Sequence, residues 1–442
     1  MSYWTNSEQD IKAMFETIGV KNFEELIANI PEKLRFKGEY QIPETISEFE
    51  AQQLLQKLAE KNLPLIPFAG GGAYDHYIPA VVDEIASRPE FYTSYTPYQA
   101  EVSQGNLQVM YEFQSLICEL TQMDVTNASM YEAGSALAEA ILLAISHTRN
   151  KKVFLSASLN QRYKRVVETY LRHMDVEIVE IPHKNFTLDL QFVKDNFSDD
   201  AACLVVQNPN FFGFLENVEE LNQIRGDSKA LLIYLYDPIS LGLLKTPGEF
   251  NADIAVAEGQ ALGNPLNFGG PYVGLFSAKE NLLRKMPGRI AGETKDADGK
   301  RGYVLTLQTR EQHIRREKAT SNICTNSGLL TLRAAVYLSA LGKKGMQQVA
   351  NLCLNKAHYL ARELQKLEGI ELASEAPFFK EFTIKLPVEA DVVVQSFLEK
   401  GMLAGISLNH IGLKDHLLVA VTEKRTKEEL DAYINLMKTI LN

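Results

Sequence analysis

The sequence has little of what marks secreted, metal-binding or membrane proteins. Its start, MSYWTNSEQDIKAMF, has neither the basic nor the apolar segment of a signal peptide. No apolar run approaches the ~18 residues of a membrane span. Widely separated cysteines with no CxxC pair predict neither a metal site nor a dense disulfide framework; they are Cys118, Cys203, Cys324 and Cys353. We therefore expect a soluble, cytoplasmic protein.

Basic charge is also scarce. The 442 residues include 45 Lys and Arg against 56 Asp and Glu, which gives a net charge of −11. Without a long basic tract, such a chain is not expected to bind nucleic acid or an anionic membrane. A hydrophobic content of 45% and a charged content of 23% are ordinary for a folded protein. The length suffices for about three domains.

Hydrophobic periodicity divides the chain into three predicted parts. Residues 1–69 predict a helical arm that packs on the protein's own body or on a partner, with helix starts at Thr5-x-x-Glu8, Asn22-x-x-Glu25 and Ser47-x-x-Glu50. Residues 70–325 predict a large α/β domain, and residues 326–442 a smaller C-terminal α/β domain. The Gly- and charge-rich stretch Gly288–Gly302 predicts a mobile surface loop.

The large domain alternates short apolar segments with helical ones. The segments expected as strands are KVFLSAS, VEIVEIP, ACLVVQNP, ALLIYLYD, DIAVAEG and YVGLFSA. This alternation predicts a mainly parallel sheet flanked by helices.

Lysine is absent from the segment between Asp253 and Gly270. A strand ends at Asp237, and Asp253 opens a second apolar strand that leads into a Gly-rich turn at Gly270. This layout is similar to the cofactor-holding half of pyridoxal-phosphate (PLP) enzymes, whose Schiff-base lysine lies between such a strand and such a turn. Here that segment has no lysine, and Ala261 stands in its place. A Schiff base needs an amine, so the scaffold is predicted without its covalent attachment point.

Two further features suit a cofactor site, and each has a plainer explanation. Gly134 and Ser135 open a helix whose backbone N–H groups could hold a phosphate, or simply allow close packing. Asp237 could hold a protonated pyridine nitrogen, or form an ordinary turn before a proline.

A loop rich in tyrosine precedes this helix, between Tyr92 and Gly105. Such dense aromatic and polar groups favour a binding role, although the tyrosines could instead anchor the loop to the core. The candidate residues are Tyr95, Tyr98, Gln99, Glu101, Ser103 and Gln104.

A basic segment from Arg310 to Thr325 is the last candidate. Arg315, Arg316 and Asn322 could bind a carboxylate or phosphate. Intrahelical ion pairs at a solvated helix end explain the same pattern equally well.

Four motifs together resemble one family. They are YTPYQAEVSQG, EAGSALAEA, GQALGNPLNFGGPYVG and TREQHIRREKATSNICT, and they are similar to the P proteins of the glycine cleavage system. Within that family the chain looks most like the first (alpha) subunit of enzymes split into two chains. The resemblance runs from about Gly70 to Thr325 and extends plausibly over the whole chain, whose length suits a half-enzyme.

This resemblance implies a PLP-dependent transferase-like fold of fold type I. It also implies an oxidoreductase, glycine dehydrogenase (aminomethyl-transferring), in which glycine is decarboxylated and its aminomethyl group passes to the lipoyl arm of the H protein. By the resemblance, the beta subunit carries the lysine and the PLP. This chain would bind no cofactor covalently, would be inactive when isolated, and would tend to self-associate through its unpaired interface.

Departures from the family pattern agree with that assignment. Gln260-Ala261 stands where His-Lys is expected, and Ser158–Gln161 lacks a ring-stacking histidine. The resemblance further implies that the Tyr95–Gln104 loop reaches across the interface toward the partner's active site. Two alternatives stay open: a self-sufficient PLP enzyme that uses Lys245 or Lys279, and a structural or regulatory partner without a catalytic contribution.

Overall fold

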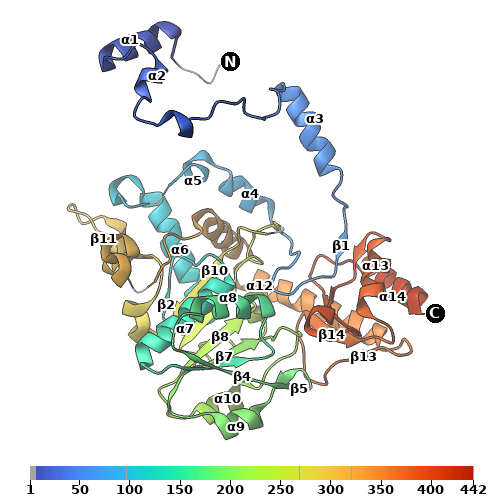
Figure 1. Cartoon of the computed structure of the whole chain (residues 1–442). Helices are drawn as coiled ribbons and strands as arrows, with labels where there is room; N and C mark the ends of the chain where they lie inside the picture. The colour runs from blue at the N-terminus through green and yellow to red at the C-terminus, as the bar shows by residue number, and fades with distance from the viewer. Residues whose placement is uncertain (1–5, 96, 268, 320, 442) are drawn as a thin grey trace. The chain divides into compact units, whose positions relative to one another are not determined.

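The computed structural model describes residues 6–95, 97–267, 269–319 and 321–441 (Figure 1). It forms two compact units, Met1–Leu63 and Pro64–Asn442. No helix among these residues is long and apolar enough to cross a membrane. Each unit is described separately below.

The N-terminal unit consists of short helices without a core of their own: α1 (Glu8–Ile18), α2 (Phe23–Leu26), a 3₁₀ turn at Glu32–Leu34, and α3 (Glu48–Ala59). Asn22 and Ser47 cap their helices as predicted. The first cap differs from the prediction, because Ser7 and Asp10 form the capping box, while Thr5 lies outside the described residues. None of these helices contains a buried residue.

A seven-stranded sheet organises the second unit, in the order β2-β10-β9-β8-β7-β3-β4. The neighbours from β9 to β4 are parallel, whereas β10 is antiparallel to both β9 and β2. The predicted mainly parallel sheet is thus confirmed. The strands are β2 (Val125–Thr126), β3 (Lys152–Ser156), β4 (Glu177–Ile181), β7 (Ala201–Asn208), β8 (Leu231–Tyr236), β9 (Ile254–Glu258) and β10 (Gly274–Ala278).

Helices cover both faces of this sheet because its strands are apolar on both sides. In β3, Phe154 packs into one hydrophobic cluster and Val153 and Leu155 into the other. Helices α7 (Ala133–Thr148) and α8 (Gln161–Leu171) lie on the second face. The first face is covered by α6 (Gln104–Thr121), α9 (Leu190–Asn196), α10 (Val218–Arg225) and the start of α12 (Gly328–Leu364).

The stretch Gly288–Gly302, predicted as a mobile loop, is instead largely a β-hairpin. Strands β11 (Ile290–Lys295) and β12 (Arg301–Thr306) pair antiparallel. Ala291, Tyr303 and Leu305 are buried against α6, and Gln114 bonds both backbone groups of Ala291. The Gly and charged residues that suggested a loop lie both in the turn, as Asp296 and Gly299 do, and in the strands, as Gly292 and Glu293 do.

The C-terminal part is a small antiparallel sheet, β13-β14-β17-β16, packed with helices. The elements are β13 (Glu371–Leu372), β14 (Glu381–Lys385), α13 (Ala390–Leu398), β16 (Ile406–Ser407), β17 (His416–Ala420) and α14 (Lys427–Leu441). Strand β1 (Ile66–Pro67) pairs with β15 (Met402–Leu403). Helix α12, interrupted at Gly342, contributes residues from Leu330 to Cys353 to the large core and residues from Ala357 to Leu364 to the small one.

Shorter elements connect these parts. They are α4 (Ala80–Ala86), α5 (Pro89–Tyr92), β5 (His183–Lys184), β6 (Thr187–Leu188), α11 (Gln312–Arg315), and 3₁₀ turns at Ala100–Val102, Ser240–Gly242, Glu280–Lys285, Gln308–Arg310, Arg316–Lys318 and Leu408–Ile411. The predicted boundaries at 69/70 and 325/326 remain predictions.

Candidate functional site

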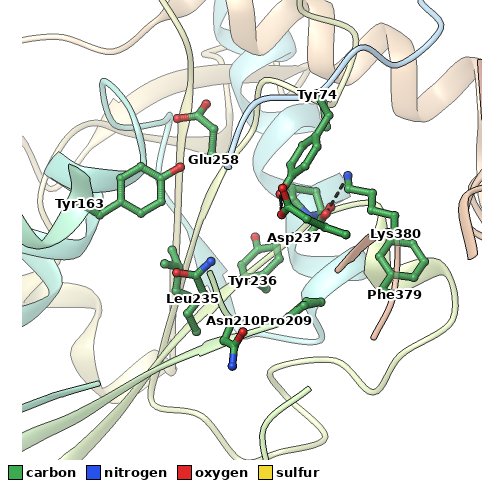
Figure 2. A pocket seen from close by; sticks show the side chains of 15 residues that line it. Tyr74, Tyr163, Pro209, Asn210, Leu235, Tyr236, Asp237, Glu258, Phe379 and Lys380 are labelled. Atoms are coloured by element: carbon green, nitrogen blue, oxygen red, sulfur yellow. Dashed lines mark hydrogen bonds and ion pairs between the residues drawn. The ribbon is translucent and has the colours of Figure 1, made fainter. Parts of the chain in front are cut away.

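A small enclosed cavity, about 40 Å³, lies at the carboxyl ends of the parallel strands β7, β8 and β9 (Figure 2). This is the edge at which open α/β sheets bind ligands. The lining residues include Gly72, Tyr74, Tyr163, Gln207, Asn210, Asp237, Glu258, Ala261, Phe379, Lys380 and Glu381. Three predicted positions, Asp237, Gln260 and Ala261, are thereby brought together at or beside one cavity.

Asp237 already has a cationic partner from this chain. The Nζ atom of Lys380 lies 2.7 Å from Asp237 Oδ2, and Ile239 N donates to Oδ1 at 2.9 Å. Lys380 is 1% exposed, so its ammonium group needs a nearby carboxylate to be tolerated. Asp237 thus forms the turn that was its plainer explanation, and it also pairs with Lys380, which sequence analysis did not predict.

An aromatic ring and a second carboxylate complete the surroundings of Lys380. Its Nζ lies 3.7 Å from the centroid of the Tyr74 ring, a cation–π distance. The Tyr74 hydroxyl donates to Glu381 Oε2 at 2.8 Å, and Gly71 N donates to Glu381 Oε1 at 2.8 Å. Tyr74 thus occupies the space above the strand ends.

Gln260 holds Tyr74 in place. Its Oε1 accepts from Tyr74 N at 2.8 Å, and its Nε2 donates to the carbonyls of Tyr74, at 3.1 Å, and Asn264, at 2.8 Å. The adjacent Ala261 is 4% exposed and lines the cavity. Gln260 is therefore a structural clamp in the described geometry.

Two acidic side chains close the start of helix α7, where Gly134 and Ser135 were candidates to hold a phosphate or to allow close packing. The Glu132 side chain accepts from the backbone N–H groups of Gly134 and, at 2.7 Å, of Ser135. Glu258 Oε2 accepts from Ala133 N at 3.2 Å. The first three N–H groups of this helix thus all donate to side chains of the same chain.

The burial of these carboxyl groups predicts a pH dependence of stability. Burial, with a contribution from Glu132, raises the pKa of Glu258 from 4.5 to about 8, and burial raises that of Glu381 to about 7. A raised folded-state pKa means that stability is fully present below the unfolded value and falls as pH rises through the folded one. Between about pH 5 and 8, we expect the two groups together to lower the free energy of unfolding by on the order of 6 kcal/mol.

Denaturant titrations across this pH range measure that slope. Glu258→Gln should flatten it, because the amide does not titrate, whereas the exposed Glu399→Gln should leave it unchanged. A wild-type slope that persists in Glu258→Gln would assign the effect to other groups.

The tyrosine-rich loop lies at a second cavity of about 200 Å³. Tyr95 is 90% exposed and Tyr98 48% exposed, and Gln99 and Glu101 are also exposed. The Tyr98 hydroxyl accepts from Arg289 NH2 at 2.9 Å. This part of the loop is exposed, and none of these four residues lines the first cavity.

The end of the loop is anchored by Gln104, whereas the plainer explanation had assigned this role to the tyrosines. Gln104 bonds the backbone of Tyr303 through both its side-chain atoms, at 2.8 Å each, and Ser103 directly precedes α6. These contacts tie the loop to β12.

Arg289 is buried, with 2% of its surface exposed. It joins the tyrosine-rich loop to the segment before α12. Its guanidinium donates to Thr325 Oγ1 at 2.7 Å, Asn326 Oδ1 at 3.3 Å and the carbonyl of Cys324 at 3.0 Å, besides Tyr98. Sequence analysis missed this residue, because it stands in the stretch assigned to a loop.

The predicted anion candidates are not brought into either cavity. Arg315 ends α11, Arg316 begins the following 3₁₀ turn, and Asn322 lies beyond it. All three are exposed, and none is among the described residues that line the two cavities.

Lys380 and Tyr74 are the other residues that sequence analysis missed. They approach Asp237 from opposite ends of the chain, so no local motif could indicate them. Glu258 had a detectable signal, since it is an acidic residue at the end of the strand that precedes Gln260.

PLP does not fit this cavity as it is built. Ala261 supplies no amine, Lys380 already pairs with Asp237, and Glu132 accepts the helix N–H groups that a phosphate would need. No step of chemistry is therefore assigned to this cavity.

Residues 1–437 match the sequence family described as the glycine cleavage system P-protein. The chain is 50% identical over 443 residues to a protein from Chloroherpeton thalassium named probable glycine dehydrogenase (decarboxylating) subunit 1, and both chains are fully covered. A protein of the same name from Moorella thermoacetica is 47% identical, again over all of both chains.

Solved structures agree with these sequence matches. A crystal structure of glycine decarboxylase (P-protein) of the glycine cleavage system, in inhibitor-bound form, superimposes with a TM-score of 0.94 at 38% identity and covers 100% of both chains. A sphingosine-1-phosphate lyase of Burkholderia pseudomallei has a TM-score of 0.69 at 12% identity, covering 93% of this chain and 94% of its own. The latter likeness shows the fold alone.

Proposed function

The chain belongs to the P-protein family of the glycine cleavage system, and on this premise we propose that it is the subunit of a two-chain glycine dehydrogenase (decarboxylating) that does not hold PLP. The partner chain holds the cofactor in this proposal. The complex decarboxylates glycine and transfers the aminomethyl group to the lipoyl arm of the H protein.

The self-filled cavity is the observation that carries this proposal. An independent PLP enzyme needs a free amine near the cofactor and an open helix terminus for its phosphate. Here Ala261 offers no amine, and Glu132 closes the helix terminus. The chain contributes to the reaction through its surface instead.

The outward-facing loop is the part of this surface that suits a shared active site. Tyr95 projects into solvent, while Tyr98 is held by a buried arginine. An exposed aromatic side chain on a fixed loop can line a channel in a neighbouring chain at small entropic cost. We assign Tyr95, Tyr98, Gln99 and Glu101 to this role.

The N-terminal unit also favours a partner. Its helices bury no residue, yet the unit carries large apolar side chains such as Phe23, Leu34, Phe36 and Leu55, all more than half exposed. Exposed apolar surface of this extent on the N-terminal unit marks a contact surface, for the protein's own body or for another chain. Without its partner, the isolated subunit is expected to self-associate.

A self-sufficient PLP enzyme is not favoured by the positions of its lysines. Lys245 pairs with Glu219, and Lys279 pairs with Asp253 at 2.8 Å. Lys380 does line the cavity, but it lies against Asp237. The pyridine nitrogen and the aldehyde of PLP are at opposite ends of the ring, so one aspartate cannot bind both the nitrogen and the attacking amine.

Reconstitution tests the proposed function. Release of CO₂ from glycine, with lipoylated H protein present, is expected only when this chain and a PLP-bearing partner are mixed. Activity of this chain alone with PLP would support the self-sufficient alternative, and full activity of the partner alone would sink the proposal.

The loop assignment predicts a separate result. Tyr95→Ala should lower kcat of the reconstituted complex by about tenfold or more, because a channel-lining side chain is lost. The Tm of the isolated chain should not change, since Tyr95 is 90% exposed. Tyr77→Ala, another exposed tyrosine at 62%, is the control. Unchanged activity of Tyr95→Ala would favour a purely structural subunit.

A further inference from the structure

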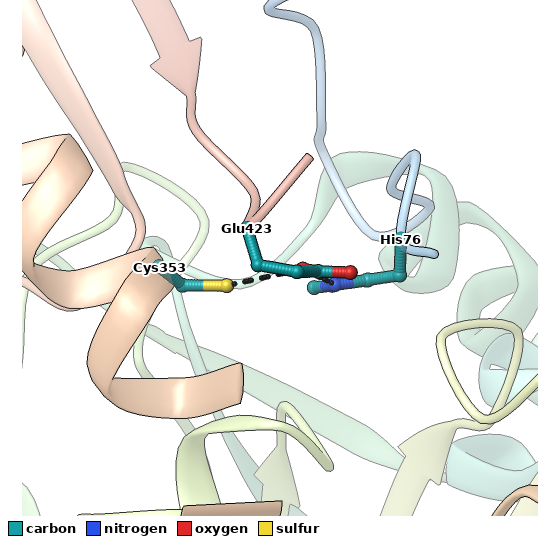
Figure 3. Close-up of side chains that lie close together, drawn as sticks. All are labelled: His76, Cys353 and Glu423. Carbon is teal, nitrogen blue, oxygen red and sulfur yellow. Dashed lines mark hydrogen bonds and ion pairs between the residues drawn. The ribbon is translucent and has the colours of Figure 1, made fainter. Parts of the chain in front are cut away.

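A continuous hydrogen-bonded chain extends from the filled cavity into the C-terminal part of the protein. Besides Asp237, Lys380 Nζ contacts His76 Nε2 at 2.9 Å. His76 Nδ1 lies 2.6 Å from Glu423 Oε2, and Cys353 Sγ lies 3.4 Å from that oxygen (Figure 3). Both His76 and Cys353 are buried. The chain of contacts therefore links the end of β8 to β14 and to the turn after β17.

The proton assignment in this network follows from Lys380. An ammonium group can only donate, so His76 Nε2 accepts from it and the Nδ1 proton is donated to Glu423. Burial, together with the charge of Lys380, lowers the pKa of His76 and keeps the ring neutral. His76, Cys353 and Glu423 are near enough to ligate a metal, but both ring nitrogens are already engaged.

Two charged side chains in and beside the cavity repeat the charges that PLP itself carries in an enzyme of this fold. An ammonium group lies against the strand-end carboxylate of Asp237, where a pyridinium nitrogen would lie. A carboxylate lies on the N–H groups of Gly134 and Ser135, where a phosphate would lie. The Tyr74 ring lies against the Lys380 ammonium group and lines the same cavity (Figure 2).

We propose that Lys380, Tyr74 and Glu132 are an internal substitute for the cofactor. They satisfy the groups that PLP would bind, and they exclude free PLP even when a lysine is supplied at residue 261. The Lys380–Asp237 ion pair also joins the residue before β14 to the end of β8. In this proposal, the chain has lost the Schiff-base lysine and has also gained side chains that take the place of the cofactor. The proposed function alone does not require this replacement.

The helix terminus gives the sharpest test, with inorganic phosphate as the probe. Glu132→Ala frees the N–H groups of Gly134 and Ser135, so phosphate should raise the Tm of the full-length variant by about 2 °C or more over chloride of equal ionic strength. Wild type should show no such shift. Glu389→Ala is the matched control, because Glu389 occupies an N-cap position without a side-chain cap bond.

Either of two results would overturn the assignment at the helix terminus. Phosphate could protect wild type as strongly as Glu132→Ala, which would mean that the terminus is open. Alternatively, Glu132→Ala could be less stable than Glu389→Ala and still gain nothing from phosphate, which would mean that the terminus is not an anion site.

Lysine substitution tests the other end of the cavity. After incubation with PLP and borohydride, peptide mapping of Ala261→Lys should find no adduct at residue 261, whereas Ala261→Lys/Lys380→Met should form one. An adduct on the single variant, none on the folded double variant, or an adduct at Lys380 in wild type would each contradict the proposal. Failure of wild-type reconstitution would sink the proposed function and leave these binding results unaffected.

Discussion

Asp237→Ala is expected to lower the free energy of unfolding of the isolated chain by about 3–5 kcal/mol, because it leaves the buried Lys380 ammonium without its carboxylate. The side chains are 12% and 1% exposed, and the atoms are 2.7 Å apart. Breaking such a pair from one side costs more than the pair itself contributes. Denaturant unfolding followed by circular dichroism measures the change.

A double variant tests whether the loss of stability comes from leaving one charge of the pair unpaired. Asp237→Ala/Lys380→Met should recover much of the loss, since neither charge then remains buried alone. The exposed pair of Lys151 and Asp175 is the matched control; Asp175→Ala should have no measurable effect. A double variant as unstable as the sum of both single variants would show that the two groups do not interact.

Arg289→Lys is expected to reduce kcat of the reconstituted complex by about 10–100-fold while leaving assembly intact. The guanidinium bonds Tyr98, Thr325 and Asn326 together with the carbonyl of Cys324. Lysine keeps the charge but cannot make these bonds simultaneously. The tyrosine-rich loop should then shift relative to the partner, and a displacement of ~1 Å can cost 10²-fold in rate.

If Arg289 acts by positioning the loop, Arg289→Lys should change the two kinetic constants to different extents. The KM for glycine should change less than kcat, because the partner chain binds the substrate in this proposal. Arg301→Lys is the control, since this exposed arginine lies on the same hairpin and over the ring of Tyr303. Unaltered kcat in Arg289→Lys, with the complex formed, would remove Arg289 and Tyr98 from the shared site.

The sheet and most helices could be predicted because their signals are local. Strands such as β8, LLIYLY, are apolar throughout, which is typical of a sheet covered on both faces. The hairpin of β11 and β12 could not be predicted in the same way. Its strands are held by Gln114 and by apolar contacts with α6, which lies far away in sequence.

The candidate site likewise combines features that are visible locally in the sequence with contacts between distant residues. The missing amine at Ala261 and the acidic strand end at Asp237 were visible in the sequence, because each is a matter of residue type at one position. The exposed loop was also marked by its composition. Its anchor was not, because Arg289 meets Tyr98 across 191 residues.

By itself, the sequence determined that this chain has the PLP-type scaffold of its family without the lysine that would hold the cofactor. Only the tertiary structure decided what replaces the cofactor. Lys380 meets Asp237, Tyr74 meets Gln260, and Glu132 closes α7. Apart from the Glu132 cap, these contacts join residues distant in sequence, and a buried charge is tolerated only where folding places a partner beside it.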